Sequence, residues 1–270
     1  VSYDKEFELR EHLYTKSLKK AYRVIAESNY GKEYALKKYN LDEKRVDVLK
    51  LLPNIRVIDS QRHIEIKTKY GIENVYIFYP AQFWAHKNHI YILKAIKFLR
   101  YVKGNSIDVI FSGSDKGNLD YILEKAKEYN IEDLVHYIGF APIEEMPYLY
   151  KQSLALVMPT YLGPTNIPPL EAFAYEVPVC YSDTTFFREQ VGDAAFFMDL
   201  KDPQSLVNHL IKIKNNDEEV GRKIAKGRQL LDDWREVDFY NMLKLNGVFI
   251  NTNGRRIYLH DSNQYNNRTR

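Results

Sequence analysis

Long apolar runs and cysteine are what this sequence most lacks. None of its apolar runs approaches the ~18 residues that a membrane-spanning helix requires, and its polar start, Val-Ser-Tyr-Asp-Lys-Glu, is not a signal peptide. The single cysteine, Cys180, has no partner for a disulfide within the chain, which fits a reducing compartment. We therefore expect a soluble cytoplasmic protein and, because the chain begins with Val1 rather than methionine, a fragment or a processed chain.

Several ligand-binding motifs are absent as well. The sequence has neither the Gly-x-Gly-x-x-Gly pattern of NAD sites nor a Walker A sequence, and it lacks the Gly-x-Ser-x-Gly turn of serine hydrolases. His86 and His89 stand close together, but no carboxylate or cysteine lies near them at a metal-ligand spacing. We therefore expect neither a bound cofactor nor a metal ion.

The chain also has little excess charge. A formal net charge of +3 over 270 residues argues against nucleic acid as a partner. Basic residues nevertheless crowd the first forty positions, where they are Lys16, Lys19, Lys20, Arg23, Lys32, Lys37 and Lys38. Two interpretations stay open: a solvated helix face, or peripheral contact with an anionic membrane surface, such as the inner membrane face, where a lipid-linked acceptor would lie.

What is present is a regular alternation of two apolar patterns. Short apolar runs predict strands at residues 22–26, 46–52, 75–79, 108–111, 134–140, 154–158, 177–181 and 195–198. Apolar residues at helical spacing predict helices at residues 3–20, 33–39, 92–99, 119–126, 144–151, 168–174, 203–213 and 218–231. This order predicts an α/β fold, a Rossmann-like parallel sheet with helices on both faces, in which ligands bind at the carboxyl ends of the strands.

The segment 161–179 has the most specific pattern. A loop of Gly, Pro, Thr and Asn follows a buried strand and leads into a helix whose first turn contains Pro168 and Pro169, where a missing N–H costs little. Loop amides and a helix N-terminus favour an anion, and Glu171 stands in the first turn. The plainer alternative is that Gly163-Pro164 is only a turn and that Glu171 only complements the helix dipole.

A second loop, residues 80–89, follows the strand predicted at 75–79. Lys87 in this loop could neutralise a phosphate as a point charge, or it could be an ordinary surface lysine. We expect Phe83 and Trp84 to pack rather than to stack on a base. A third loop, Ser112-Gly113-Ser114, follows the strand predicted at 108–111 and is a weak signal by itself.

Two of these segments resemble a known family. Pro-Thr-Asn-Ile-Pro-Pro-Leu-Glu-Ala-Phe-Ala, followed by Val-Pro-Val, and the Gln-Phe-Trp and His-Lys-Asn of the 80–89 loop are similar to the donor site of family 4 retaining glycosyltransferases, also called group 1. The resemblance extends over about residues 22–214. It implies the C-terminal half of a GT-B fold, with Lys87 on the donor diphosphate and Glu171 on the ribose, and it implies no bound metal.

The resemblance also implies which other residues line the donor site. These are Gln82, His86, Gly113, Ser114, Gly139, Phe140, Gly163, Pro164, Thr165, Asn166 and Ile167. The sequence departs from the family at two of them: Gly163 replaces the first of two glutamates, and Gln82 replaces an arginine. We therefore expect the loop around Thr165 and Asn166 to contact the sugar. We expect Lys87, the loop amides and His86 to bind the diphosphate.

The resemblance implies an organisation and a reaction. Residues 1–55 are expected to be the remnant of an N-terminal acceptor domain with a linker, residues 56–250 the nucleotide-sugar-binding domain, and residues 251–270 a disordered tail. The expected reaction transfers a sugar from a UDP-, GDP- or ADP-sugar to a glycan or lipid-linked acceptor with retention of configuration, in polysaccharide or glycolipid synthesis. This chain alone is not expected to transfer efficiently. A nucleotide-sugar epimerase of the same fold and a binding module without activity stay open as alternatives.

Overall fold

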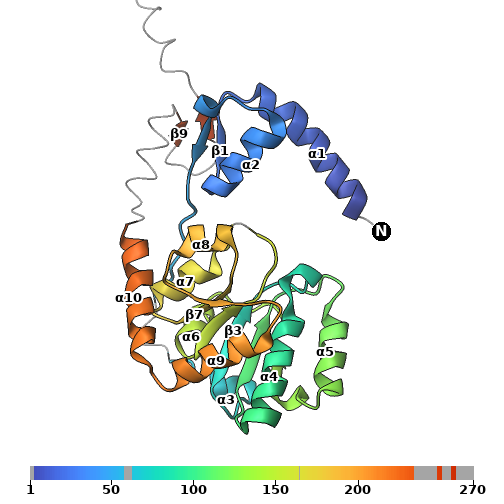
Figure 1. The fold of residues 1–270 in the computed structure, drawn as a ribbon, viewed down its shortest axis with the longest axis vertical. Coiled ribbons are helices and arrows are strands. Elements are labelled where there is room, and N and C mark those ends of the chain that lie inside the picture. Colours follow the sequence, from blue (N-terminus) through green and yellow to red (C-terminus); the bar gives the residue numbers. More distant parts are fainter. Residues whose placement is uncertain (1–2, 58–62, 164, 234–247, 251–256, 260–270) are drawn as a thin grey trace, which may run out of the picture. The chain divides into compact units, whose positions relative to one another are not determined.

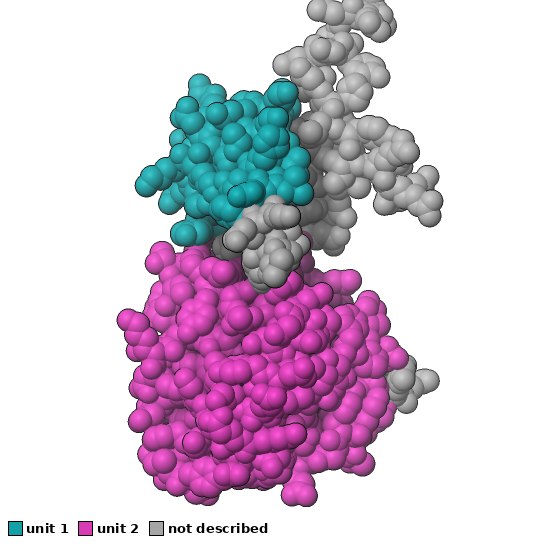
Figure 2. All heavy atoms as spheres, turned by 90° about the vertical axis from the view of Figure 1, so that its right-hand side faces the viewer, with its two compact units in different colours: residues 1–51, 233–270 teal, residues 52–232 magenta. Residues whose placement is uncertain are grey.

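The computed structural model describes residues 3–57, 63–163, 165–233, 248–250 and 257–259 (Figure 1). The chain forms two compact units, residues 1–51 with 233–270 and residues 52–232, which Figure 2 distinguishes by colour. We expected the second domain to run from residue 56 to residue 250. The second unit instead ends where its last helix, α10, ends at Asp232, and the residues that follow are grouped with the first unit.

The first unit contains a small parallel β-α-β arrangement. Helix α1 spans Tyr3–Lys20, strand β1 spans Val24–Ala26, helix α2 spans Asn29–Tyr39 and strand β2 spans Val46–Val48. A 3-10 turn at Glu43–Arg45 precedes β2, and β1 pairs with β2 so that Val24 lies opposite Val46. Helix α2 begins four residues earlier than the apolar pattern predicted, because Ser28 caps it by accepting a hydrogen bond from the Gly31 amide (3.0 Å).

Two short strands lie near the C-terminus. Strand β9 spans Val248–Ile250 and pairs antiparallel with β10, Ile257–Leu259. The tail that we expected to be disordered from residue 251 therefore contains a strand, which its Asn- and Arg-rich composition did not indicate. Residues 263–270, on which that expectation mainly rested, lie outside the described residues.

The second unit contains the six-stranded parallel sheet that the sequence predicted. Its strands are β3 (Tyr76–Pro80), β4 (Asp108–Ser112), β5 (Val135–Tyr137), β6 (Ala155–Met158), β7 (Val179–Ser182) and β8 (Phe196–Met198). They lie side by side in the order β5-β4-β3-β6-β7-β8, and every neighbouring pair is parallel. The order reverses between β3 and β6, which is where open α/β sheets bind their ligands.

Helices cover both faces of this sheet (Figure 1). They are α3 (Ile66–Tyr70), α4 (His89–Lys103), α5 (Leu119–Glu128), α6 (Met146–Lys151), α7 (Pro168–Ala174), α8 (Thr185–Val191), α9 (Pro203–Lys214) and α10 (Glu218–Asp232), with 3-10 turns at Ala85–Lys87 and Glu132–Leu134. Helix α4 packs against α5 and α9, and α7 packs against α10. None of the described helices combines the length and the apolar character that a bilayer crossing requires.

Because both faces of the sheet are buried, the sequences of its strands are unbroken apolar runs. Every residue of β4, β6 and β7 is buried, and so are Tyr76 to Tyr79 of β3. Cys180 lies in β7 with no exposed surface, as predicted for a core residue, and burial raises the pKa of its thiol. Close packing continues outside the sheet, since a Cβ on Gly227 of α10 would lie 2.4 Å from the Phe173 ring of α7.

Two helices differ from the sequence prediction. Helix α8 was not predicted, because its seven residues carry only the pair Phe187 and Val191 at helical spacing; Thr184 caps it by accepting from the Phe187 amide (3.4 Å). Helix α3 falls within the segment that we expected to be an irregular linker. It is held by a side chain distant in sequence, since the Gln152 amide oxygen accepts from the Ile66 amide (3.0 Å).

Candidate donor site at the carboxyl edge of the sheet

Loops after β3, β4 and β6 meet at the carboxyl edge of the sheet. Backbone hydrogen bonds join the loops after β3 and β6, because the Tyr161 amide donates to the His86 carbonyl oxygen (2.9 Å). The buried Asn88 side chain adds a second link by donating to the Pro159 carbonyl oxygen (3.1 Å). The two segments that resembled a donor site are therefore parts of one structure, 70 or more residues apart in sequence.

Lys87 and Asn166 face each other across these two loops. The Lys87 ammonium nitrogen lies 3.4 Å from Oδ1 of Asn166, and the Tyr79 hydroxyl donates to the Lys87 carbonyl oxygen (2.8 Å), which fixes the backbone below the ammonium group. Burial lowers the pKa of Lys87. Among the described residues no carboxylate forms an ion pair with Lys87, so its charge faces a neutral amide.

Asn166 is buried and holds the loop in shape. Its Nδ2 donates to the Gly163 carbonyl oxygen and to the Tyr181 hydroxyl, both at 2.7 Å. Gln190 binds the backbone of Asn166 in both directions, accepting from its N–H (3.4 Å) and donating to its carbonyl oxygen (2.6 Å). Tyr181 and Gln190, which we did not predict, thus complete a buried polar network in which the Tyr181 hydroxyl also donates to Gln190 (3.1 Å).

Gly163 occupies a position that disfavours any side chain. Its φ of +106° is a left-handed conformation, and a Cβ there would lie 3.1 Å from Oδ1 of Asn166. Asn166 therefore fills the space beside the position at which the family has its first glutamate. Thr165 is half-buried, and Ile167 precedes α7 and accepts from the Leu170 amide (2.9 Å). Pro164 lies outside the described residues.

Glu171 lies in the first turn of α7, as predicted, with Pro168 and Pro169 before it. It is half-buried, and its Oε2 accepts a hydrogen bond from the Tyr150 hydroxyl of α6 (2.7 Å). Burial raises the pKa of Glu171, and the bond from Tyr150 opposes this by stabilising the carboxylate. Within the described part of the chain, Oε1 has no hydrogen-bond partner.

Gly113 allows the loops after β3 and β4 to touch. Its φ is +149°, and a Cβ would lie 2.4 Å from the Ala81 carbonyl oxygen, so only glycine fits. The Phe83 amide donates to the Ser114 carbonyl oxygen (3.0 Å), and the Gly113 amide donates to the Gly139 carbonyl oxygen (2.8 Å). The structure thus brings Gly113, Ser114 and Gly139 together beside the loop after β3.

The remaining predicted residues lie at the rim. Phe140 is 85% exposed, and Gln82 is exposed with its side-chain oxygen accepting from Trp84 Nε1 (2.9 Å). His86 is half-buried and stacks near Trp84, with ring centroids 6.3 Å apart. Burial, and then the nearby Lys87 charge, lower the pKa of His86.

His89 was not predicted to be part of the core. It has no exposed surface and stacks on Phe83, with centroids 4.2 Å apart and planes 10° apart. Phe83 is likewise fully buried, which confirms that it packs. Burial lowers the pKa of His89 to about 3. Neither ring nitrogen has a hydrogen-bond partner within the described residues, and no group of three or more His, Cys, Asp or Glu side chains among them could hold a metal ion.

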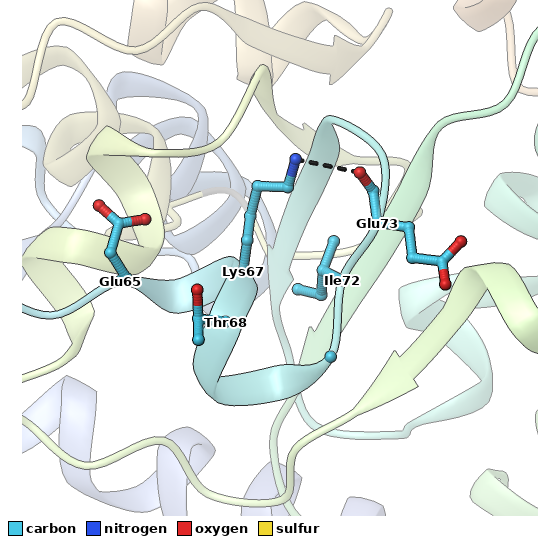
Figure 3. Close-up of a pocket in the computed structure, with 6 residues that line it drawn as sticks. Glu65, Lys67, Thr68, Ile72 and Glu73 are labelled. Carbon is cyan, nitrogen blue, oxygen red and sulfur yellow. Dashed lines mark hydrogen bonds between the residues drawn. The ribbon is translucent and has the colours of Figure 1, made fainter.

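An open hollow lies at the other end of the second unit, around α3 and the turn that precedes β3 (Figure 3). Its lining residues are Glu65, Lys67, Thr68, Gly71, Ile72 and Glu73. Lys67 spans it by donating to the Glu73 carbonyl oxygen (3.1 Å). None of the predicted donor-site residues lines this hollow, which lies toward the amino ends of the strands.

Comparison with known proteins decides the family. Residues 60–230 match the description "Glycosyl transferases group 1". The chain belongs to this family. It is 26% identical over 217 residues to O-antigen chain mannosyltransferase B of Escherichia coli, and 26% identical over 209 residues to O-antigen chain mannosyltransferase RfbU of Salmonella typhimurium. The alignments cover 79% and 76% of this chain but only 56% and 55% of those proteins, so the chain spans about half the length of these curated relatives.

The fold is shared with solved structures. The chain superposes on HepE from Anabaena, solved in complex with UDP-glucose, with a TM-score of 0.69 at 16% identity, over 83% of this chain and 63% of that one. At this identity the likeness concerns the fold, and it agrees with the Rossmann-like parallel sheet described above. This member of the group 1 family therefore has the α/β architecture of the GT-B fold.

Proposed function

We propose that the second unit of this group 1 glycosyltransferase binds the nucleotide-sugar donor of a retaining, family 4 reaction. The observation that carries the proposal is the pairing of Lys87 with Asn166 where the strand order reverses, between β3 and β6. A half-buried cation that faces only a neutral amide is costly to hold, and an anionic ligand relieves that cost. The donor diphosphate is such an anion, and Lys87 would bind it by charge-assisted hydrogen bonds.

The ribose and the base would extend from the diphosphate toward α7 and the loop after β5. Glu171 has Oε1 available to accept from a ribose hydroxyl, while Oε2 is held by Tyr150. Gly113, Ser114 and Gly139 form one joined wall, and the exposed Phe140 follows it. We assign the base to this wall through backbone contacts.

The sugar would meet a neutral surface. Gly163 leaves no carboxylate in the loop. Both Nδ2 protons of Asn166 are engaged within the protein, so Asn166 would offer a sugar hydroxyl only its Oδ1 as an acceptor. The hydroxyl of Thr165 can both donate and accept. In the proposed reaction the bond from the anomeric carbon to the diphosphate oxygen breaks, and the acceptor oxygen forms a new bond to that carbon on the same face. The departing phosphate takes the hydroxyl proton, and configuration is retained. Lys87 would stabilise the charge that develops on the leaving diphosphate.

The acceptor would be a glycan or a lipid-linked saccharide. The two curated relatives are named as O-antigen mannosyltransferases, which supports a place in polysaccharide or lipopolysaccharide synthesis. Peripheral contact with an anionic membrane stays a prediction for the first unit. Three of its basic residues already pair with acids, since Arg23 binds Asp47 (3.2 Å), Lys32 binds Glu43 (3.3 Å) and Lys38 binds Glu11 (2.7 Å). Lys16, Lys19 and Lys20 of α1 and Lys37 of α2 are left as the basis for that prediction.

A binding module without activity is the second candidate. It is favoured by the two positions at which charge is missing, Gly163 and Gln82, and by the engagement of Gln82 with Trp84 (2.9 Å) rather than with the site. Turnover separates the candidates, because a glycosyltransferase releases nucleoside diphosphate from its donor in the presence of an acceptor. An epimerase of the same fold would instead return a nucleotide-sugar of altered configuration.

Binding is tested by a thermal-shift panel of UDP, GDP, ADP, UDP-glucose and GDP-mannose on this chain. The last two are included because of the neighbour's ligand and the relatives' names. A nucleotide at about 100 times its Kd is expected to stabilise the folded chain by about 2.7 kcal/mol. If none of these nucleotides raises the melting temperature, the proposed donor site is wrong.

A further inference from the structure

Glu171, the candidate ribose ligand, is hydrogen-bonded by Tyr150, a residue that the sequence motifs of the donor site do not include. Tyr150 stands in α6, 21 residues before Glu171, and its hydroxyl donates to Oε2 of Glu171 at 2.7 Å. No other described residue donates to this carboxylate. The orientation of the Glu171 side chain in the folded protein therefore depends on Tyr150.

Tyr150 is itself rigidly placed. Its ring has no exposed surface and meets the ring of Phe78 edge-on, with centroids 5.1 Å apart and planes at 85°. Tyr175 also stacks on it, with centroids 5.6 Å apart and planes at 26°. Tyr175 in turn accepts from the Arg56 amide (3.2 Å) and donates to the Arg56 carbonyl oxygen (3.1 Å). The packing of the ring thus fixes the position of the Tyr150 hydroxyl oxygen.

We propose that Tyr150 is a positioning residue for the donor, whose hydroxyl holds Oε2 of Glu171 so that Oε1 is presented to the ribose hydroxyls. This inference rests on the proposed function, because it requires Glu171 to bind ribose. A glutamate side chain has several rotatable bonds, and fixing them costs conformational entropy. If Tyr150 fixes them before the ligand arrives, ligand binding no longer bears this entropy cost. A hydrogen-bonded carboxylate oxygen also keeps the group charged when it is half-buried.

The charge of Glu171 is set by a small number of neighbours. Tyr150 on α6 is the side chain that hydrogen-bonds to it, and Tyr175, just after α7, stacks on Tyr150. Other titratable or charged side chains on the elements around it include Glu176 just after α7, Cys180 and Tyr181 on β7 and Arg228 on α10. Glu176 is already paired with Arg228, and Cys180 and Tyr181 are buried groups whose pKa values are raised by burial, so both stay neutral. Tyr150 is therefore the neighbour whose loss changes the protonation of Glu171 most.

Replacing Tyr150 by phenylalanine tests the proposal. Tyr150→Phe keeps the ring packing and removes only the donor, so the carboxylate becomes mobile and easier to protonate. The Kd values for UDP, GDP and ADP are measured by calorimetry between pH 5 and pH 8, and each is divided by the wild-type Kd at the same pH, which cancels protonation of the phosphate itself. The ratio is expected to be about two- to tenfold near pH 7, the effect of one hydrogen bond, and to grow as the pH falls.

Tyr76→Phe is the matched control. Tyr76 is also fully buried, and its hydroxyl donates to the carbonyl oxygen of Leu149 in α6 (3.0 Å), next in sequence to Tyr150 but away from the carboxylate. Each variant loses one hydrogen bond donated by a buried hydroxyl, and their free energies of unfolding are expected to fall by similar amounts. Only Tyr150→Phe is expected to lose nucleotide affinity and to change its pH dependence.

A further pair of variants keeps the outcome decisive. Glu171→Asp retains the charge, but its side chain is one methylene shorter and no longer reaches the Tyr150 hydroxyl. It is expected to weaken nucleotide binding by a similar factor. This variant tests the proposal even if Tyr150→Phe fails to fold. Wild-type affinity and pH dependence in Tyr150→Phe, with weak binding by Glu171→Gln, would overturn the positioning role and leave the donor site intact. Unchanged affinity in Glu171→Gln, or no binding of any of the three nucleotides by wild type, would overturn the proposed function itself.

Discussion

Lys87 and Asn166, which are 79 residues apart in sequence, lie with Nζ of the first 3.4 Å from Oδ1 of the second. The amide is a weak partner for an ammonium group, so it orients the cation without neutralising it. The same amide group is bound on its other side to the Gly163 carbonyl oxygen and to the Tyr181 hydroxyl. The lysine therefore faces a fixed surface and retains its capacity to bind an anion.

Lys87→Ala is expected to weaken nucleoside diphosphate binding by about ten- to a hundredfold, because charge-assisted hydrogen bonds contribute about 1.5–3 kcal/mol. Nucleoside binding should change little, since the ammonium meets phosphate and not base or ribose. Calorimetry with UDP against uridine, and with GDP against guanosine, measures the difference. Lys94→Ala, which removes an exposed lysine of α4, is the control. Equal losses for the nucleotide and its nucleoside would remove Lys87 from the phosphate site.

Gly113→Ala is expected to destabilise the second unit, because the new methyl group would meet the Ala81 backbone at 2.4 Å and no flexible side chain can yield. Overpacking of this kind costs about 1–3 kcal/mol in the free energy of unfolding. Urea unfolding measures the loss. Gly117→Ala is the control, because Gly117 also has a positive φ (+89°) but has nothing within 4 Å of the added methyl group. A Gly113→Ala variant that loses no more than Gly117→Ala would show that the two loops can separate freely.

His89 is expected to make the protein sensitive to acid. Its pKa is about 3 in the folded protein, below the ordinary value of 6.5, so the unfolded chain binds its proton first as the pH falls. The free energy of unfolding should therefore decline below pH 6.5 by up to about 1.4 kcal/mol per pH unit from this residue alone. His89→Phe keeps the stacking on Phe83 and should flatten the profile between pH 6.5 and pH 4. Urea unfolding curves for both proteins that run parallel over this range would contradict the burial of His89 as a neutral ring.

The sequence was sufficient for most of the sheet, and it placed two candidate site residues, Lys87 and Glu171, after strands of that sheet. All six strands of the second unit were predicted, because a parallel sheet covered on both faces leaves unbroken apolar runs. Their ends were less accurate: β5 stops at Tyr137 rather than at residue 140, since Gly139 turns with a φ of +68°. Glu171 and Lys87 were predicted as donor ligands because their segments resemble the family's donor site; each segment also follows a predicted strand, and their roles stay predictions.

The residues that support the site could not be found in this way. Tyr150, Tyr181 and Gln190 lie in two helices and a strand, and each contacts the site only because the chain crosses the sheet between them. The close approach of Gly113 to Ala81 is likewise a property of two loops and not of either one. The sequence gives no sign that His89 belongs to the core, because its burial depends on stacking against Phe83 of the preceding loop.

The most direct test of the account is whether Glu171 binds ribose. Calorimetry should compare ribonucleoside diphosphates with their 2′,3′-dideoxy analogues on the wild-type protein and on Glu171→Gln. If Glu171 binds the ribose hydroxyls, the wild-type protein prefers the ribonucleotide, and Glu171→Gln loses about 1.5–3 kcal/mol of ribonucleotide affinity together with most of that preference. If Glu171 only complements the dipole of α7, the variant loses at most about 1 kcal/mol of stability and no nucleotide affinity. Equal binding of both kinds of nucleotide by the wild-type protein would contradict the assignment of the donor site.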